Sequence, residues 1–295
     1  GSMGSSLAEI GEMFEAGCVG ISDDGLPVMN SKVMRHAMEY VRAFGIPVIS
    51  HAEDRNLSGN GVMNEGFISN RLGLRGIPNA SEEVIVARDI TLAELTGAHL
   101  HIAHVSAAGS VRLIREAKIR GIRVTSEVTP HHFSLTDQAI LNYDTNAKVN
   151  PPIRTGKDIE EIREGLKDGT IDVIATDHAP HSEDEKKVEF DLAPFGISGL
   201  ETGLSLSLSL VKEGILSLPE LIRKLTFNPS RIVRINRGTL KVGAVADVVI
   251  FDPEKLITVD RMKFRSKGKN SPFHGWKLNG EVTHTIVGGK IVYSR

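Results

Sequence analysis

Short runs of apolar residues that end in a carboxylate or an imidazole recur along this sequence. Four segments have this form: residues 18–24 (CVGISDD), 46–51 (IPVISH), 100–104 (LHIAH) and 172–181 (DVIATDHAPH). A β-branched run between turn residues is typical of a strand buried on both faces of a parallel sheet. Each strand would therefore present a polar side chain at its carboxyl end, where barrel enzymes carry out their chemistry.

Helical periodicity fills the intervals between these strands. Helices are predicted over residues 7–16, 31–44, 81–97, 106–120, 157–168, 199–213, 218–225 and 229–235. Ser31, Ser81 and Ser106 stand at three of the helix starts, where a hydroxyl can accept a hydrogen bond from a free backbone amide. The alternation of strands and helices predicts an α/β fold of the (β/α)8 TIM-barrel type.

The alternating region contains five such strands, which end near Asp24, His51, His104, Glu127 and Asp177. A closed barrel of this type has eight strands, so we expect the first strands of the barrel to be missing from this chain. An open doubly wound sheet is the alternative, because five strands can form one by themselves. The barrel is favoured, since ligands on four strand ends meet only if the strands curve around a common centre.

Two domains of unequal size are expected. Residues 7–237 form the partial barrel, and residues 238–295 form a small β domain with strands at 246–251 and 285–293. The second strand segment includes a hairpin turn at Gly288-Gly289. Polar stretches rich in glycine or proline are predicted to be loops that surround the mouth of the sheet: residues 53–80, 129–154 and 181–199.

Composition narrows the class of partner. The 295 residues carry 35 basic and 37 acidic side chains, with a net charge of -2 and no basic run, which argues against nucleic-acid or anionic-membrane binding. A small-molecule substrate is expected instead. Cys18 is the single cysteine, so an intrachain disulfide is excluded and a cytoplasmic location is expected. No apolar run reaches the length of a transmembrane helix.

Asp24, His51, His104 and Asp177 are the candidate metal ligands. Imidazole and carboxylate groups at the ends of neighbouring strands suit zinc, and a carboxylate can bridge two ions. Asp177 can serve both as a ligand and as the base that takes a proton from an attacking water. Four other histidines are expected to have no such role: His99 and His101 would face the helices, and His131 and His132 would lie in a loop.

Seven stretches together resemble the class I dihydroorotases, zinc enzymes of pyrimidine synthesis in the amidohydrolase superfamily. They are SDDG (22–25), ISHAED (49–54), HIAHVS (101–106), EVTPHHF (127–133), KVNPPIR (148–154), ATDHAPH (175–181) and APFGISGLET (193–202). The resemblance implies reversible conversion of N-carbamoyl-L-aspartate and dihydroorotate. The tail from residue 238 resembles the C-terminal part of the small β-sandwich of that family.

The resemblance also implies roles for particular residues. Asp24 would bridge two zinc ions, His51 and His104 would complete one of them, and Asp177 would bind the other and shuttle the proton. The substrate would be held by four further residues: Asn150, His181, Phe195 and Gly196. A homo-oligomer and a complex with aspartate transcarbamoylase are further expectations from the family.

The sequence departs from the family pattern in one respect. The His-x-His-x-Arg motif of the first barrel strand, which supplies two zinc ligands and a substrate-binding arginine, has no counterpart here. We therefore expect fewer than two zinc ions per chain and impaired activity of this chain alone. Two alternatives remain open: a non-catalytic subunit or scaffold, and a hydantoinase, dihydropyrimidinase or allantoinase. The second group usually carries a carboxylated lysine at the position of Asp24.

Overall fold

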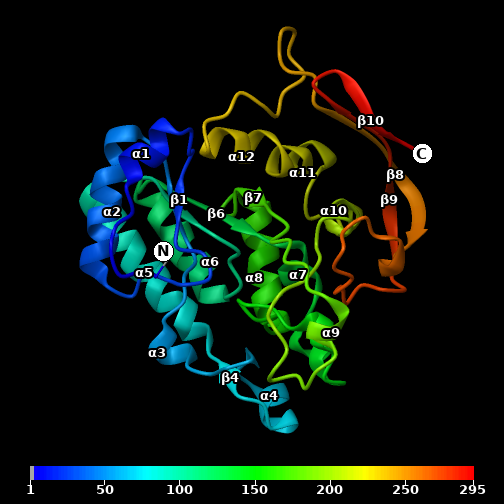
Figure 1. Cartoon of the computed structure of the whole chain (residues 1–295), viewed down its shortest axis with the longest axis horizontal. Coiled ribbons are helices and arrows are strands. Elements are labelled where there is room, and N and C mark those ends of the chain that lie inside the picture. Colours follow the sequence, from blue (N-terminus) through cyan, green and yellow to red (C-terminus); the bar gives the residue numbers. More distant parts are fainter. Residues whose placement is uncertain (1–2) are drawn as a thin grey trace.

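A five-stranded parallel sheet forms the centre of the molecule (Figure 1). The structure is a computed structural model that describes residues 3–295. The strands are β1 (Ile21–Ser22), β2 (Val48–Ser50), β5 (Leu100–Ile102), β6 (Val124–Val128) and β7 (Val173–Ile174). Their spatial order, β1-β2-β5-β6-β7, is also their order in the sequence. Each strand thus lies beside the next one, as in consecutive β/α units of a barrel, which confirms the predicted fold class.

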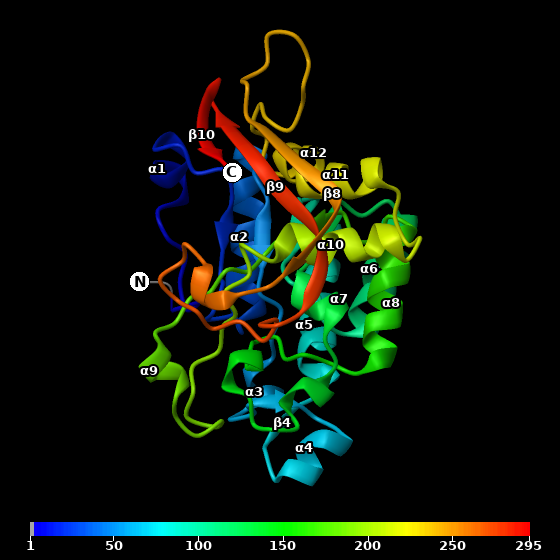
Figure 2. The same cartoon turned by 90° about the vertical axis from the view of Figure 1, so that its right-hand side faces the viewer.

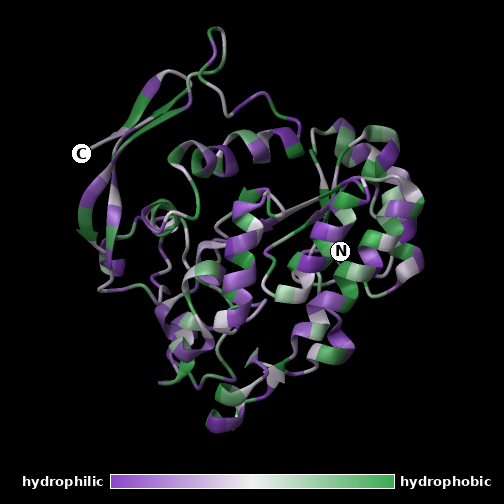
Figure 3. Ribbon diagram, turned by 180° about the vertical axis from the view of Figure 1, so that it is seen from behind, coloured by the Kyte–Doolittle hydropathy of each residue, from purple (hydrophilic) through white to green (hydrophobic). Residues whose placement is uncertain are grey.

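Helices pack along the outside of this sheet, as the sequence predicts. They are α1 (Ile10–Glu15), α2 (Ser31–Phe44), α5 (Asn79–Thr96), α6 (Ala108–Ile119), α8 (Gly156–Lys167), α10 (Gly203–Lys212), α11 (Leu218–Leu225) and α12 (Phe227–Ile232). Leu100 and Ile102 of β5 share one buried apolar core with Val86 of α5 and Val111 of α6. Figure 3 shows how apolar and polar segments alternate along these helices. The apolar face of each helix therefore supplies one side of the core.

Two predicted helix caps are wrong. Asn30, not Ser31, caps α2, because its side-chain oxygen accepts hydrogen bonds from the backbone N–H groups of Lys32 and Val33. The helix expected at Ser81 begins at Asn79, and the Ser81 hydroxyl donates to the Pro78 carbonyl inside the first turn. Asn30 and Pro78 thus occupy the capping positions that the sequence pattern gave to serine, and Pro78 makes no side-chain cap hydrogen bond.

Helix α6 begins without the cap expected from Ser106. The carboxylate of Glu82, on α5, accepts hydrogen bonds from the backbone amides of Ser106 and Ala107 and from the Ser106 hydroxyl. The next two amides of the chain donate to Asp158 and Glu83. Three carboxylates from other helices thus satisfy the free amides at this terminus and complement its partial positive charge.

The stretch 53–80 is more ordered than the predicted loop. It contains α3 (Arg55–Ser58), β3 (Met63–Asn64), α4 (Phe67–Leu72) and β4 (Gly76–Ile77), and β3 and β4 pair in parallel. Arg154 anchors this unit, because its guanidinium donates to the Asn64 side chain and to the Ile77 carbonyl. The contacts come from residues far along the chain, so local sequence gives little sign of them.

The predicted loop 129–154 also begins with a helix, α7 (Pro130–Ser134). Pro130 occupies its first turn, and Thr129 caps it by accepting a hydrogen bond from the His132 amide. A threonine followed by proline is a helix-start pattern, which the proline content of this stretch obscured. The rest of the predicted loops holds only short turns of helix: η1 (Asp137–Ile140), η2 (Thr145–Ala147) and α9 (Glu183–Lys186).

The C-terminal segment forms a separate antiparallel sheet (Figure 2). Its strands are β8 (Val248–Thr258), β9 (Lys277–Val287) and β10 (Lys290–Ser294), with η3 (Arg261–Lys263) between the first two. Gly288 and Gly289 make the predicted hairpin turn with φ of 55° and 80°. The sheet contacts the rest of the chain through α10, where the Ser205 hydroxyl donates to the Gly280 carbonyl. None of the helices in residues 3–295 is long and apolar enough to cross a membrane.

We expect Glu82→Ala to lower the free energy of unfolding by about 3 kcal/mol. The change removes the acceptor for three donors at the start of α6 and leaves the buried Arg154 charge without one of its stabilising carboxylates. The matched control is Glu94→Ala, which breaks an exposed ion pair with Arg120 between the same two helices and should cost less than about 1 kcal/mol. Urea unfolding followed by circular dichroism measures both values, and equal losses would contradict this account of the terminus.

Candidate metal and substrate site

Three of the four predicted metal ligands meet at the carboxyl edge of the parallel sheet. The ligand atoms of Asp24, His51 and His104 all lie within 4.8 Å of one another. His51 Nδ1 is 3.3 Å and His104 Nε2 is 3.6 Å from Asp24 Oδ1, and the two nitrogens are 2.9 Å apart. Among residues 3–295, these three residues form the one group of three or more donors that could hold a metal ion.

The strand register places these side chains side by side. Ser22 of β1 pairs with Ile49, and Ser50 of β2 pairs with Ile102, so the turns that follow the three strands leave the sheet at one edge. Asp23 fixes the first turn, because its carboxylate accepts hydrogen bonds from the His51 and Val28 amides. The predicted ligand positions therefore follow from parallel pairing plus one carboxylate that ties two strand ends together.

Asp177 follows β7 but does not join the three-donor group. Burial raises the pKa of its carboxyl, and the charge of Asp24 adds to this effect, while His104 opposes it. Asp177 has a φ of 44° and His104 a φ of 33°, both in the left-handed region that L side chains rarely adopt. Strained backbone of this kind clusters at functional sites, where the surrounding structure holds it in place.

Interactions within the donor group shift the pKa values of Asp24 and His51. Hydrogen bonds from His104 and His51 hold the pKa of Asp24 far below its usual range. Burial of the His51 ring disfavours its charged form, but hydrogen bonds to Asp24 and Glu53 prevail and raise the pKa of His51 to about 9. A protonated His51 ring therefore stabilises the cluster at neutral pH.

The donor set fits zinc. Two imidazole nitrogens and one carboxylate oxygen are a common ligand set for this ion, and a water molecule can complete the tetrahedron. The imidazoles of His51 and His104 are buried, whereas the Asp24 side chain is 66% exposed. A pocket of about 430 Å³ reaches Asp24 and gives solvent access to this side of the group.

Glu53 is a site residue outside the set of ligands predicted at the strand ends. Its Oε2 lies 3.3 Å from His51 Nε2 and accepts a 3.1 Å hydrogen bond from Asn150 Nδ2. Burial raises the pKa of Glu53, but hydrogen bonds from His51, Ser58 and Asn150 outweigh it and lower the pKa to about 2. A carboxylate two residues after a strand-end histidine is the signal that could have indicated it.

The residues predicted to hold substrate lie on two loops that contact each other. The Gly196 amide donates to the Lys148 carbonyl, two residues before Asn150. His181 Nε2 donates to the Phe195 carbonyl at 2.8 Å. A side chain at Gly196 would collide with the Ala179 carbonyl and the His181 ring, at 2.8 and 2.9 Å from its first carbon. Their roles toward a substrate stay predictions.

Two buried lysines hold the loop that carries Phe195. Lys148 donates to the carbonyls of Phe190 and Asp191, and its ammonium lies 4.7 Å from the centre of the Phe195 ring. Lys186 donates to the Pro194 and Thr145 carbonyls. Because burial dominates, the pKa of Lys186 falls to about 8. These ammonium groups lock an otherwise irregular loop through backbone carbonyls.

The positions of His99 and His101 differ from those predicted. His99 and His101 do not face the helices: both contact the Thr125 hydroxyl, and His101 Nε2 lies 3.1 Å from Glu127, on the sheet face opposite the apolar core. The reason is that Leu100 and Ile102, which alternate with them, fill the helix side.

His131 and His132 do not lie in a loop, as predicted, but in a helix. Both are buried in α7, and His132 contacts the Thr129 hydroxyl and the Pro151 carbonyl. Neither joins the donor group of Asp24.

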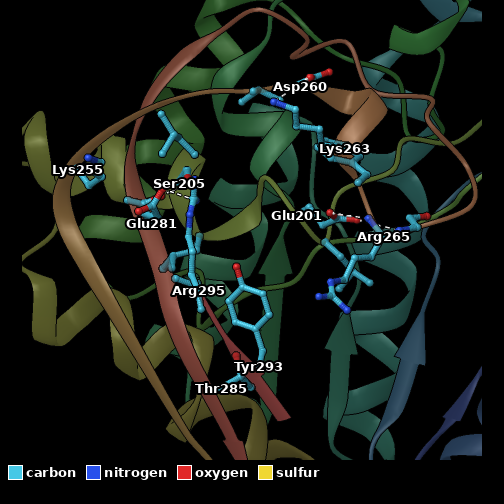
Figure 4. A pocket seen from close by; sticks show the side chains of 18 of the residues that line it. Glu201, Ser205, Lys255, Asp260, Lys263, Arg265, Glu281, Thr285, Tyr293 and Arg295 are labelled. Carbon is cyan, nitrogen blue, oxygen red and sulfur yellow. Dashed lines mark hydrogen bonds and ion pairs between the residues drawn. The ribbon is translucent and has the colours of Figure 1, made fainter. Parts of the chain in front are cut away.

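A larger pocket, of about 920 Å³, borders the C-terminal sheet (Figure 4). It is lined by β8 and β9 on one side and by residues 200–205 and 263–266 on the other. The Arg265 amide donates to the Glu201 carboxylate there, and the Arg265 guanidinium lies 5.4 Å from the Tyr293 ring. None of the predicted metal ligands lines it.

Comparisons with known proteins agree with this architecture. The model of the amidohydrolase family matches residues 4–292. The dihydroorotase of Geobacter metallireducens is 60% identical over 295 residues, which is 100% of this chain and 70% of the relative. The dihydroorotase of Pelotomaculum thermopropionicum is 59% identical over 293 residues, 99% of this chain and 69% of the relative.

Solved structures show the same fold. The L-hydantoinase (dihydropyrimidinase) of Arthrobacter aurescens superposes with a TM-score of 0.86 at 27% identity, over 97% of this chain and 67% of that chain. A D-hydantoinase from Bacillus sp. AR9 gives a TM-score of 0.86 at 22% identity, over 98% of this chain and 68% of that chain. The chain belongs to the amidohydrolase family and, within it, to the dihydroorotases.

Proposed function

We propose that this chain carries most of the active site of a zinc-dependent dihydroorotase, which interconverts dihydroorotate and N-carbamoyl-L-aspartate in pyrimidine synthesis. The observation that carries the proposal is the convergence of Asp24, His51 and His104 at strand ends in a sequence 60% identical to a dihydroorotase. Similarity to the hydantoinases is weaker, at 27% identity or below for those compared above.

The chemistry is hydrolysis of a cyclic amide. A zinc ion held by Asp24, His51 and His104 would supply Lewis-acid activation of water and of the amide carbonyl. Asp177 accepts a proton from the attacking water and returns it to the ring nitrogen as the carbon–nitrogen bond breaks. Its raised pKa suits the first step, because a carboxylate with a higher pKa is a stronger base toward the proton of the attacking water.

Substrate positioning is assigned to the two joined loops. Asn150, His181 and the backbone at Phe195 and Gly196 surround the ring and its carboxylate. The Gly196–Lys148 hydrogen bond and the buried ammonium of Lys148 keep the two loops in one arrangement. Such preorganisation reduces the entropy lost when substrate binds.

Further parts of the proposal come from the family resemblance: a homo-oligomer, a complex with aspartate transcarbamoylase and a cytoplasmic location. A second zinc ion would need donors beyond the three-residue group, because Asp177 is the one further predicted ligand. The alternative is that the protein is a scaffold without activity, and turnover measurements distinguish the two.

Substrate choice tests the proposed function. The zinc-loaded protein should convert dihydroorotate with a kcat/KM at least about tenfold above that for hydantoin or allantoin, because discrimination of this size needs only one or two productive contacts. A coupled absorbance assay with equal substrate concentrations provides the measurement. Faster turnover of hydantoin would reject the substrate and keep the hydrolase chemistry. Because impaired activity is expected of this chain alone, the scaffold would be favoured if a full-length version also turned over none of the three.

Asp177→Asn should lower kcat by about 10²-fold or more in both directions, because the same carboxyl accepts and donates the proton. Asparagine tolerates the left-handed backbone at this position, so the fold should persist. Asp184→Asn, on the exposed helix α9, is the matched control and should leave kcat unchanged. Activity of Asp177→Asn within about tenfold of the parent would mean that another group moves the proton.

Metal analysis tests the donor group. The purified chain should bind about one zinc ion, and His104→Ala should remove it, since three donors fall to two. Zinc must displace a proton from His51 below its pKa of about 9, so affinity should increase with pH up to that value. His36→Ala, on the exposed face of α2, is the control. Unchanged zinc content in His104→Ala would place the metal elsewhere.

A further inference from the structure

One carboxylate oxygen connects the donor group to the predicted substrate loop. Glu53 Oε2 lies within hydrogen-bond distance of both His51 Nε2 and Asn150 Nδ2. The other nitrogen of the same His51 ring faces Asp24 and His104. A continuous chain of contacts therefore runs from Asp24 through His51 and Glu53 to Asn150, and its last contact joins two residues that are 97 positions apart in sequence.

The contact at His51 fixes the ring. A histidine whose Nε2–H donates to a carboxylate presents Nδ1 with its lone pair, and Nδ1 is the atom that faces the donor group. Carboxylates that orient ligand histidines in this way commonly change metal affinity by about 10- to 100-fold when removed. Glu53 is placed to have this effect on His51.

The contact at Asn150 fixes the side-chain amide. Glu53 Oε2 is an acceptor, so the Asn150 group that faces it must be the NH₂. The amide oxygen, Oδ1, then points away from Glu53, and no group in residues 3–295 donates a hydrogen bond to it. Asn150 is half-buried, so Oδ1 remains accessible to a ligand. Without Glu53, rotation of the amide by half a turn would offer NH₂ instead.

We propose that Glu53 is a positioning residue that turns the Asn150 carbonyl oxygen toward the substrate, so that the site selects cyclic amides with a free ring N–H. The inference rests on the proposed function and adds a specificity determinant to it. An acceptor at Asn150 stabilises a ring N–H, whereas a methyl group on that nitrogen removes the donor and occupies the space of the hydrogen bond. A carboxylate or carbonyl of the substrate would be repelled at the same place.

Three variants separate this role from general support of the loop. Glu53→Ala removes both contacts. Glu53→Gln keeps an oxygen that can accept hydrogen bonds from His51 and Asn150, so it should retain the substrate selectivity and the zinc affinity of the parent. Asp54→Ala is the matched control, because Asp54 caps α3 in the same loop but touches neither His51 nor Asn150. Circular dichroism and thermal unfolding confirm that each variant is folded before binding is measured.

The specificity readout is a ratio of affinities. Calorimetry on the zinc-loaded chain compares dihydroorotate with its two ring N-methyl derivatives. The parent protein should prefer the N–H compound over at least one methylated derivative by about 10²-fold or more, since a buried polar group left without its partner is costly. In Glu53→Ala the ratio should shrink to about tenfold or less, and Glu53→Gln and Asp54→Ala should keep the parent ratio.

The second readout does not depend on the substrate. Competition with a chromophoric chelator should show zinc affinity about 10- to 100-fold weaker in Glu53→Ala and within about threefold of the parent in the other two variants. A ratio and an affinity that are both unchanged in Glu53→Ala would overturn the inference. So would equal losses in Asp54→Ala, since these would point to general disorder of the loop.

Hydantoin and its N-methyl derivatives serve as a parallel ligand pair. If dihydroorotate does not bind but hydantoin does, the proposed substrate is rejected, and the hydantoin ratio in Glu53→Ala still decides the role of Glu53. If neither parent compound binds the zinc-loaded protein, the selection of ring N–H groups is overturned along with the proposed substrate.

Discussion

The approach of one carboxylate to two buried imidazoles is the interaction on which the site depends. Asp24, His51 and His104 come from turns after three adjacent strands, so their meeting requires the parallel register of the sheet. A cluster of this kind is costly to bury unless a proton or a metal ion compensates its charges. The same arrangement thus supplies a candidate metal site and a reason for the strained backbone at His104.

A second layer of charged groups holds the loops around this edge. Glu82 satisfies the start of α6, and Arg154 joins the Ser106 hydroxyl to the β3–β4 unit. Lys148 and Lys186 bind backbone carbonyls of the Phe195 loop. These buried charges satisfy backbone groups that a loop cannot satisfy within itself, so they fix the conformation of the loops at the mouth of the sheet.

The C-terminal sheet is less buried than the parallel sheet. Its strands are long, but much of their apolar surface is open to solvent, including Leu256 at 59% and Ile291 at 65% exposed. Its main contacts with the remainder are through α10, where Gly280 allows close approach to Leu208. The parallel sheet and its helices therefore form the well-buried part of the molecule, and the site belongs to that part.

The sequence by itself determined the five strands of the parallel sheet, the order of the long helices and the metal-ligand candidates, because β-branched runs and amphipathic periodicity are local signals with strong physical causes. It also indicated that Asp24, His51 and His104 would converge, since parallel strands share a carboxyl edge. Only the tertiary structure decided which groups cap α6, that His131 is buried, that His101 lies opposite the helices and that Glu53 joins His51 to Asn150. Each of these depends on side chains from distant segments that meet only after folding, and no local pattern encodes such a meeting.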